Sequence, residues 1–177
     1  MSTADLTLRT MRTVLRPVTA EDSATLTAIR RSREVARWWH GPDFLNADAA
    51  SQSKTLFAIE LSGAHDIGPD GAVIGMIQAR EGDDPEYAVA SIEVFLAGSV
   101  HRRGLGREVV AVILRWLVEV RGHHRITSDP ALNNIAAIAC YRACGFEPIG
   151  VMHRYEHDTE GKCWHDNLLM EYVAPIT

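Results

Sequence analysis

Residues 101–120 read HRRGLGREVVAVILRWLVEV, and they combine a glycine- and arginine-rich loop with a helical pattern. Apolar residues recur every three or four positions, which predicts one buried helix face. N–H groups at a helix start bind anions, and Gly104 and Gly106 leave room near the backbone. A nearly alternating run from Ser91 to Leu96 predicts a preceding strand. Together these features predict a pyrophosphate-binding turn. The predicted buried stripe comprises Leu105, Val109, Val112, Ile113, Trp116, Leu117 and Val120.

Length and composition favour a single globular domain over residues 1–177. The chain has 177 residues, of which 46% are hydrophobic, enough for a sizeable core. Its net charge of −5 argues against a general nucleic-acid binder. No apolar run reaches the roughly 20 residues of a membrane span, and the N-terminus lacks an apolar signal core. We therefore expect a cytoplasmic protein without a membrane partner.

The three cysteines, Cys140, Cys144 and Cys163, match no zinc spacing, so we expect reduced thiols and no metal site. Charge is unevenly distributed. Residues 101–125 hold six arginines and two glutamates, whereas residues 81–93 and 156–171 each hold five acidic residues. The first region is suited to an anionic ligand and the other two to a cationic one. The alternative for any single residue is a solvated surface charge.

Periodicity and turn residues predict an α/β fold in which a mixed sheet is flanked by helices. One helix starts at a capping box at Thr19, and a second piece stops at Gly41-Pro42. The last two strands are expected to pair around a turn at 158–161. Predicted strands are 13–17, 55–61, 72–79, 91–97, 125–128, 150–155 and 164–172, and the later helices are 35–40, 105–120 and 135–143.

The motifs resemble the GNAT superfamily of acetyl-CoA-dependent N-acetyltransferases. The family loop reads [QR]-x-x-G-x-[GA], and residues 101–106 match it except that His101 occupies the first position. A second block, Asn134 with Tyr141 and Gly145-Phe146, is similar to the family's N-x6-Y-x3-G-F segment. The resemblance covers about residues 13–173. It implies a mostly antiparallel central sheet flanked by helices, and acetyl-CoA as co-substrate.

Within the superfamily, three segments resemble the aminoglycoside 6′-N-acetyltransferases. Residues 35–41 are similar to a helix end with Trp-Trp-Gly. Ser91-Ile92-Glu93 resembles a Gly-Ile-Asp segment, with the carboxylate one methylene longer, and Ser128-Asp129-Pro130 resembles Thr-Asp-Pro. Trp164-His165-Asp166 is similar to a C-terminal strand of the same relatives, with weaker specificity. The resemblance implies an acceptor site containing Trp38, Trp39, Glu93, Asp129 and Asp166.

Two residues are candidates for proton transfer. Glu93 can take the proton of the attacking amine, directly or through water; the alternative is a surface carboxylate. The resemblance places Tyr141 near the thioester sulfur, where its phenol can protonate the leaving thiolate; the alternative is a packing tyrosine. Asn134 can hydrogen-bond the pantetheine arm, and the alternative is a helix cap. Asp129 can contact an ammonium group, and the alternative is a turn-forming aspartate. The tryptophans line the acceptor site or belong to the core.

The remaining cofactor residues form the strand end and the loop. A backbone N–H at Phe95 or Leu96 is expected to stabilise the oxyanion. The full predicted cofactor set is Phe95, Leu96, His101, Arg102, Arg103, Gly104, Leu105, Gly106, Arg107, Asn134 and Tyr141.

The leading hypothesis is an N-acetyltransferase that acetylates an amine of a polycationic small molecule, by direct transfer in a ternary complex, as a monomer or homodimer. The favoured acceptor is the 6′-amine of an aminoglycoside, which would confer antibiotic resistance. One alternative keeps the chemistry and takes another amine, such as a protein N-terminus, a polyamine or a siderophore-type lysine. Another is a non-catalytic module that binds acyl-CoA.

Overall fold

The computed structural model describes residues 6–39, 54–82, 86–87, 89–157 and 163–175. Its eight strands form one sheet in the order β1-β2-β3-β4-β5-β6-β8-β7, in which only β5 and β6 are parallel neighbours. The strands are β1 (Leu8–Arg9), β2 (Thr13–Pro17), β3 (Lys54–Leu61), β4 (Val73–Glu81), β5 (Val89–Leu96), β6 (Arg125–Ser128), β7 (Glu147–His157) and β8 (Trp164–Val173). The helical elements are η2 (Ala20–Asp22), α1 (Ser23–Arg31), α2 (Arg33–Ala36), η3 (Gly98–Val100), α3 (Leu105–Arg115), η4 (Trp116–Val120) and α4 (Ile135–Ala143).

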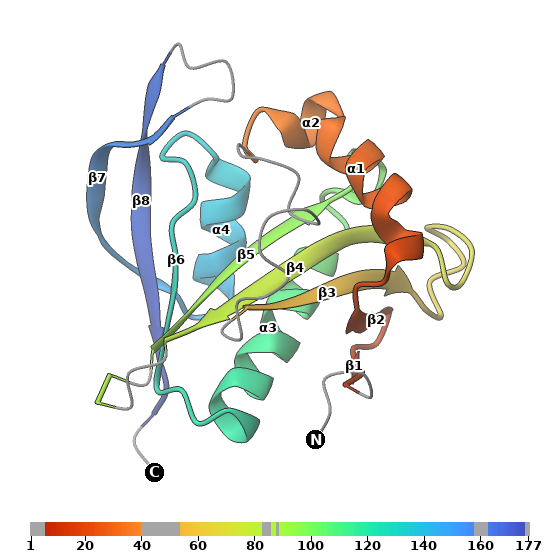
Figure 1. The fold of residues 1–177 in the computed structure, drawn as a ribbon, viewed down its shortest axis with the longest axis horizontal. Coiled ribbons are helices and arrows are strands. Elements are labelled where there is room, and N and C mark those ends of the chain that lie inside the picture. Colours follow the sequence, from red (N-terminus) through yellow and green to blue (C-terminus); the bar gives the residue numbers. More distant parts are fainter. Residues whose placement is uncertain (1–5, 40–53, 83–85, 88, 158–162, 176–177) are drawn as a thin grey trace.

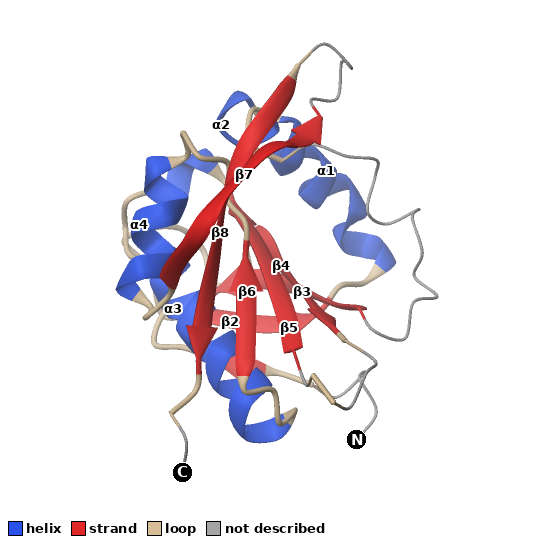
Figure 2. Ribbon diagram, turned by 90° about the vertical axis from the view of Figure 1, so that its left-hand side faces the viewer, coloured by secondary structure: helices blue, strands red, loops and turns tan. Residues whose placement is uncertain are grey.

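Helices cover both faces of the sheet. Figure 2 shows α3 and α4 on one side and α1 and α2 on the other. The larger core lies under α3, where Val109, Ile113 and Leu117 are fully buried against the strands. A smaller core joins α1 and α2 to β4 and β5 through Leu26 and Phe95. Period-two alternation along β5 therefore sends odd-numbered side chains toward α1 and α2 and even-numbered ones toward α3.

The sheet opens between β5 and β6, and this opening positions the site. The two strands pair only from Val89 to Ser91 on β5 with Arg125 to Thr127 on β6. Beyond that short ladder they diverge, as Figure 1 shows above their common lower end. The second half of β5 therefore has a paired edge toward β4 and an unpaired edge toward β6.

The observed elements confirm the predicted mixed sheet and most of the predicted segments. The strands at 13–17 and 125–128 and the helix at 135–143 have the predicted bounds, and the capping box at Thr19 and Asp22 is present. The helix predicted over 35–40 instead spans Arg33–Ala36, with a turn at residues 37–38. His40, the Gly41-Pro42 stop and the turn at 158–161 lie outside the described residues.

Two further details differ from the prediction. The two-residue strand β1 carries no periodic signal in the sequence because its pairing with β2 is too short to show one. The last helical turn, η4, widens to a π-helix, so Val120 is turned out of the stripe and is 63% exposed. No helix in the described ranges is long and apolar enough to cross a membrane.

Candidate active site

The glycine-rich loop forms the predicted turn at the start of α3. Gly104 is the N-cap with φ +82°, and Arg102 also adopts a left-handed conformation at φ +61°. The backbone N–H groups of Arg107 and Glu108 donate the first helical hydrogen bonds, both to the Gly104 carbonyl, at 3.1 and 3.3 Å. The N–H groups of Leu105 and Gly106 thus lie outside the helical ladder and carry the positive end of the helix dipole. This geometry fits an anionic phosphate group.

Arg12 lies between β1 and β2 and was not singled out from the sequence. Its guanidinium holds this loop in place. Its Nη2 donates to the Arg103 carbonyl at 2.9 Å. Its Nε donates to Glu108 Oε1 at 2.8 Å, so the same guanidinium is held by the first turn of α3. A Cβ on Gly104 would lie 3.3 Å from Arg12 Nη2. The loop backbone is therefore tied to a residue more than 90 positions away in the sequence.

Gly106 also allows close packing around the start of α3. A Cβ at this position would meet Cys140 Sγ at 3.3 Å and Leu96 Cδ1 at 3.8 Å. The missing side chain therefore allows α3 to pack closely on α4 and β5. Cys140 and Cys144 are free thiols that share a hydrogen bond, and Cys144 Sγ lies 3.6 Å from the Arg107 carbonyl.

The unpaired edge of β5 presents backbone groups beside the loop. Ala97 N–H donates to the Ile74 carbonyl at 2.7 Å, and Gly82 N–H donates to the Val89 carbonyl at 2.9 Å. Val89 of β5 and Ala97, the residue after β5, are both odd-numbered, and bonded pairs alternate along an antiparallel ladder. The N–H of Phe95 therefore faces β4, whereas the N–H of Leu96 faces the opening. Of the two predicted oxyanion donors, the geometry favours Leu96.

His101 contacts the same strand end through its side chain. Its ring Nε2 lies 2.8 Å from the Leu96 carbonyl oxygen, and because a carbonyl only accepts, Nε2 carries the proton. The ring itself is exposed. His101 thus links the beginning of the loop to the last residue of β5.

Glu93 lies on β5, on the sheet face that α1 and α2 cover, and its side chain is 41% exposed. It stands directly across from Gln78 of β4, which hydrogen-bonds to it. Loss of hydration, followed by the charge of Asp129, raises the pKa of Glu93, and Arg80 at 3.8 Å opposes the rise. A carboxylate in this setting accepts a proton more readily than one in water.

Asp129 follows β6 and forms an acidic cluster with Glu93 and Glu156, three carboxylates from β5, the end of β6 and β7. Burial raises the pKa of Asp129, Glu156 adds to the rise, and a hydrogen bond from Tyr155 opposes it. Asn167 of β8 connects two members, since its Nδ2 donates to the Asp129 carbonyl at 2.8 Å and to Glu156 Oε2 at 3.2 Å. The cluster is suited to a cation.

Tyr141 of α4 is buried near this cluster. Its phenol hydrogen-bonds with Ser128, and burial raises its pKa, with the charges of Glu93 and Asp129 adding to the rise. The phenol therefore stays protonated at neutral pH and is able to donate a proton. Its ring also packs edge-on against Phe146, with ring centroids 5.1 Å apart, in agreement with the packing alternative.

The two tryptophans take different positions. Trp39 packs edge-on against Phe95, with ring centroids 5.0 Å apart, and joins the smaller core beside Glu93's strand. Trp38 is stacked by Arg37, whose guanidinium carbon lies 4.7 Å from the ring centroid. Asn134 caps α4, where its side chain accepts from Ala137 N–H at 3.2 Å, in agreement with the capping interpretation.

Asp166 lies outside the acidic cluster. Its Oδ1 accepts from Arg154 N–H at 2.8 Å and its Oδ2 lies 2.9 Å from His153 Nδ1. Adjacent strand residues point to opposite faces, so Asn167 faces Asp129 while Asp166 faces the β7 bend. The hydrogen bond from the Arg154 backbone lowers the pKa of Asp166. The structure therefore does not bring Asp166 together with Glu93.

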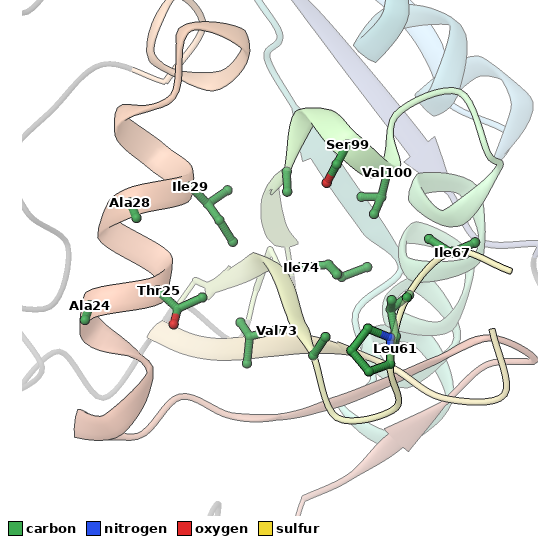
Figure 3. A pocket seen from close by; sticks show the side chains of 14 residues that line it. Ala24, Thr25, Ala28, Ile29, Leu61, Ile67, Val73, Ile74, Ser99 and Val100 are labelled. Carbon is green, nitrogen blue, oxygen red and sulfur yellow. The ribbon is translucent and has the colours of Figure 1, made fainter. Parts of the chain in front are cut away.

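A pocket of about 580 Å³ lies elsewhere, between α1 and the β3–β4 hairpin. Thr25 and Ile29 of α1, Val73 and Ile74 of β4 and Ser99 line it, as Figure 3 shows. None of its lining residues is titratable, so it offers no acid or base.

Gln78, Tyr155, Glu156 and Asn167 complete the site but were not singled out from the sequence. Gln78 and Asn167 are buried polar residues inside apolar strands, and that contrast is a usable signal. Tyr155 and Glu156 have no such signal, because only an irregularity of β7 directs them to Asp129.

The family model described as "Acetyltransferase (GNAT) domain" matches residues 12–147. "Aminoglycoside N(6')-acetyltransferase type 1" of Klebsiella pneumoniae is 26% identical over 155 residues, which cover 78% of this chain and 75% of the relative. The structure of AAC(6')-Ib with paromomycin and acetyl-CoA superposes with a TM-score of 0.71 at 25% identity, covering 91% of this chain and 93% of that one.

Two more distant structures share the fold. The ribosomal-protein-S5-alanine acetyltransferase of Vibrio fischeri has a TM-score of 0.78 at 16% identity, with coverage of 96% and 97%. The spermidine N-acetyltransferase of Vibrio cholerae, solved with CoA and spermine, has a TM-score of 0.77 at 16% identity, with coverage of 93% and 96%.

Proposed function

The chain belongs to the GNAT family of acetyltransferases, and we propose that it acetylates an amine of a small polycationic molecule, favouring the 6′-amine of an aminoglycoside. The observation that carries the proposal is the meeting of Glu93, Asp129 and Tyr141 where β5 and β6 diverge. Two carboxylates with raised pKa values stand beside a buried, protonated phenol. This is a base, a cation site and an acid around one opening.

GNAT acetyltransferases use acetyl-CoA, which supplies the acetyl group as an activated thioester. The residues present fit this co-substrate. The N–H groups of Leu105 and Gly106, with Arg102, Arg103 and Arg107 around them, would hold the pyrophosphate. The unpaired edge of β5 would hold the pantetheine arm, with Asn134 at the start of α4 beside it.

The chain's residues then divide the chemistry of a direct transfer. Asp129 attracts the ammonium form of the acceptor, and Glu93 removes its proton, directly or through water, so that the nitrogen can attack the thioester carbon. Leu96 N–H donates to the carbonyl oxygen as it gains negative charge. The carbon–sulfur bond breaks as the carbonyl re-forms, Tyr141 gives its proton to the departing sulfur, and the second proton that the nitrogen loses returns to Tyr141 through water. The proton taken up by Glu93 is released to solvent after product formation.

Trp38, Trp39 and the acidic cluster support a cationic sugar as acceptor. An indole covers the apolar face of a sugar ring while carboxylates bind its ammonium groups. The likeness to aminoglycoside 6′-N-acetyltransferases, in sequence and in structure, supports the same choice. Under this proposal the protein would protect a cell from such antibiotics.

An amine panel tests the proposal through the release of CoA thiol. It includes an aminoglycoside with a 6′-amine, its analogue with a 6′-hydroxyl, a peptide with a free N-terminus and a linear polyamine. We expect turnover of the 6′-amine compound, a product acetylated at that nitrogen by mass spectrometry, and little turnover of the hydroxyl analogue. Rapid turnover of the peptide, with none of either aminoglycoside, would reassign the acceptor to protein amines.

A further inference from the structure

Two thiols lie one helical turn apart at the end of α4. Cys140 belongs to the last turn of the helix, and Cys144 is its C-cap. Both are free and half-buried, whereas Cys163, which precedes β8, is exposed. The proposed acetyl transfer uses neither Cys140 nor Cys144. The end of α4 therefore carries two nucleophilic side chains that the transfer leaves without a role.

Both thiols face the first turn of α3. Cys144 Sγ lies 3.6 Å from the Arg107 carbonyl oxygen. Cys140 Sγ lies beside Gly106, where an added Cβ would be 3.3 Å from it. The N–H groups of this turn and the guanidinium of Arg107 make the surroundings of the two sulfurs positive. A positive setting favours the thiolate, which is the nucleophilic form of cysteine.

The two thiols have different roles in their shared hydrogen bond. The hydrogen bond from Cys140, aided by the charge of Arg107, lowers the pKa of Cys144 against the opposing effect of burial. The same hydrogen bond, together with burial, raises the pKa of Cys140. Cys140 therefore keeps its proton, and Cys144 loses its proton more readily than an ordinary cysteine does. Cys144 is also partly exposed, so a small molecule can approach it.

The spacing of the two thiols disfavours a direct bridge between them. Side chains one helical turn apart have Cβ atoms about 5–6 Å from each other. A disulfide needs a Cβ separation of about 3.5–4.5 Å. Closing the bridge would distort the last turn of α4, which packs closely on α3 at Gly106. A disulfide with an external thiol has no such requirement.

We infer that Cys144 is a modification site that forms a mixed disulfide with a small thiol delivered as its own disulfide, and that Cys140 assists as hydrogen-bond donor. The Cys144 thiolate attacks one sulfur of the incoming disulfide. A new sulfur–sulfur bond forms, the bond within the incoming disulfide breaks, and its second half leaves as a thiolate that takes up a proton from solvent. Cys144 is oxidised and the departing half is reduced, so no other oxidant is needed.

The modification would act on acetyl-CoA binding. An adduct on Cys144 would lie beside Arg107 and the first turn of α3, where the N–H groups are proposed to hold the pyrophosphate. Its bulk would crowd this turn, and the carboxylates of an adduct such as glutathione would repel the pyrophosphate. This consequence rests on the proposed function, whereas the modification itself does not.

Glutathione disulfide tests the modification site in the absence of any substrate. The wild type is incubated with it at pH 7, and peptide mapping by mass spectrometry gives the rate of modification at each cysteine. Cys163 is the internal control, because it is an exposed thiol. We expect Cys144 to react at least about tenfold faster than Cys163, since a larger fraction of it is thiolate.

Variants of Cys140 test its role as donor. Cys140→Ala, which removes the donor, should slow the reaction of Cys144 several-fold, and Cys140→Ser, which keeps a donor, should restore most of the rate. Equal rates at Cys144 and Cys163 in the wild type would overturn the modification site. So would reaction at Cys140 in place of Cys144, or an internal bridge without an adduct. These comparisons within the wild type do not depend on the folding of a variant.

Calorimetric titration of acetyl-CoA separates the modification from the proposed function. Cys163→Ser is titrated before and after treatment with glutathione disulfide, so that Cys144 carries the adduct. We expect the treated protein to bind acetyl-CoA at least about fivefold more weakly, and dithiothreitol to restore the affinity. Cys144→Ser should keep its affinity within twofold after the same treatment. Selective reaction of Cys144 with unchanged affinity would leave the modification site standing and contradict the proposed pyrophosphate site at α3.

Discussion

The loop before α3 and the acidic cluster are built in opposite ways. The loop occupies one continuous segment, and its function depends on backbone N–H groups and a left-handed Gly104. The acidic cluster draws one carboxylate each from β5, the end of β6 and β7, brought together by the sheet. Under the proposed function, the difference teaches that the groups for co-substrate binding lie in one segment, which Arg12 holds in place, whereas acceptor recognition depends on strand register and on the irregularity of β7.

If this division holds, changes in the cluster lower turnover and changes at the loop weaken acetyl-CoA binding. The largest effect is expected for Glu93→Gln, which removes the base and preserves the side-chain shape. We expect kcat to fall about 100-fold, the usual scale of general base catalysis, with the KM for acetyl-CoA within twofold of wild type. Steady-state kinetics with a 6′-amine aminoglycoside provides the measurement.

The pH profile checks the same assignment. As the proposed base, Glu93 would act in its ionised form, and its pKa is raised, so the wild type should lose kcat on acidification at a higher pH than an ordinary glutamate would impose. Glu93→Gln should lose this acidic limb. An unchanged limb in the variant would assign the titration to another group.

Arg12→Gln should have the next largest effect, and it should act on the loop before α3. Without the guanidinium, the Arg103 carbonyl and Glu108 lose their common partner and the loop backbone is released. We expect the KM for acetyl-CoA to rise about fivefold to tenfold with kcat unchanged, a cost on the order of 1 kcal/mol. Arg9→Gln, an exposed arginine on β1, is the control. A fall in kcat alone would contradict the division.

Sequence reasoning worked where structure is local. The helix at 135–143 and the strand at 125–128 have their predicted bounds because periodicity and flanking turns define them. Glu93 lies on the opposite face from buried Ile92 because side chains alternate strictly along a strand. The predicted buried stripe along α3 and η4 is wrong only at Val120, where a π-turn changes the helical periodicity.

The parts that sequence reasoning missed depend on contacts between distant segments. Arg12 reaches a loop over 90 residues away, which no local pattern records. Asp166 was predicted in the acceptor site as part of a Trp-His-Asp segment, yet its oxygens are engaged by the β7 bulge. Its neighbour Asn167 faces the cluster instead. A one-residue shift along a strand reverses the face, so the bulge that sets the register decides the outcome.

Gly104→Ala sharpens the comparison because a matched glycine exists outside the site. Gly104 and Gly122 have φ values of +82° and +77°, so alanine carries a similar backbone penalty of roughly 1 kcal/mol at each. Nothing lies within 4 Å of a Cβ on Gly122, whereas one on Gly104 approaches Arg12. Urea denaturation should show similar losses of stability for both variants. Calorimetry should show weaker acetyl-CoA binding, about threefold, for Gly104→Ala alone.

The smallest expected effect concerns the stability of the acidic cluster itself. Because the pKa of Glu93 is raised in the folded state, folding favours its protonated form. Any stability gained from that form is present below the unfolded pKa and lost as pH rises through the folded pKa. Glu93→Gln, which is never ionised, should therefore be more stable than wild type at pH 8 and not at pH 4.

The gain should stay below about 1 kcal/mol, since Glu93 is 41% exposed and solvent screens its charge. Urea denaturation at both pH values measures it, with Glu147→Gln as the exposed control. A gain at pH 8 combined with lost turnover would mean that the carboxylate is kept for chemistry at the expense of stability. Equal stability of Glu93→Gln and wild type at both pH values would mean that Glu93 titrates as it does in the unfolded chain, and that bringing the three carboxylates together does not raise its pKa.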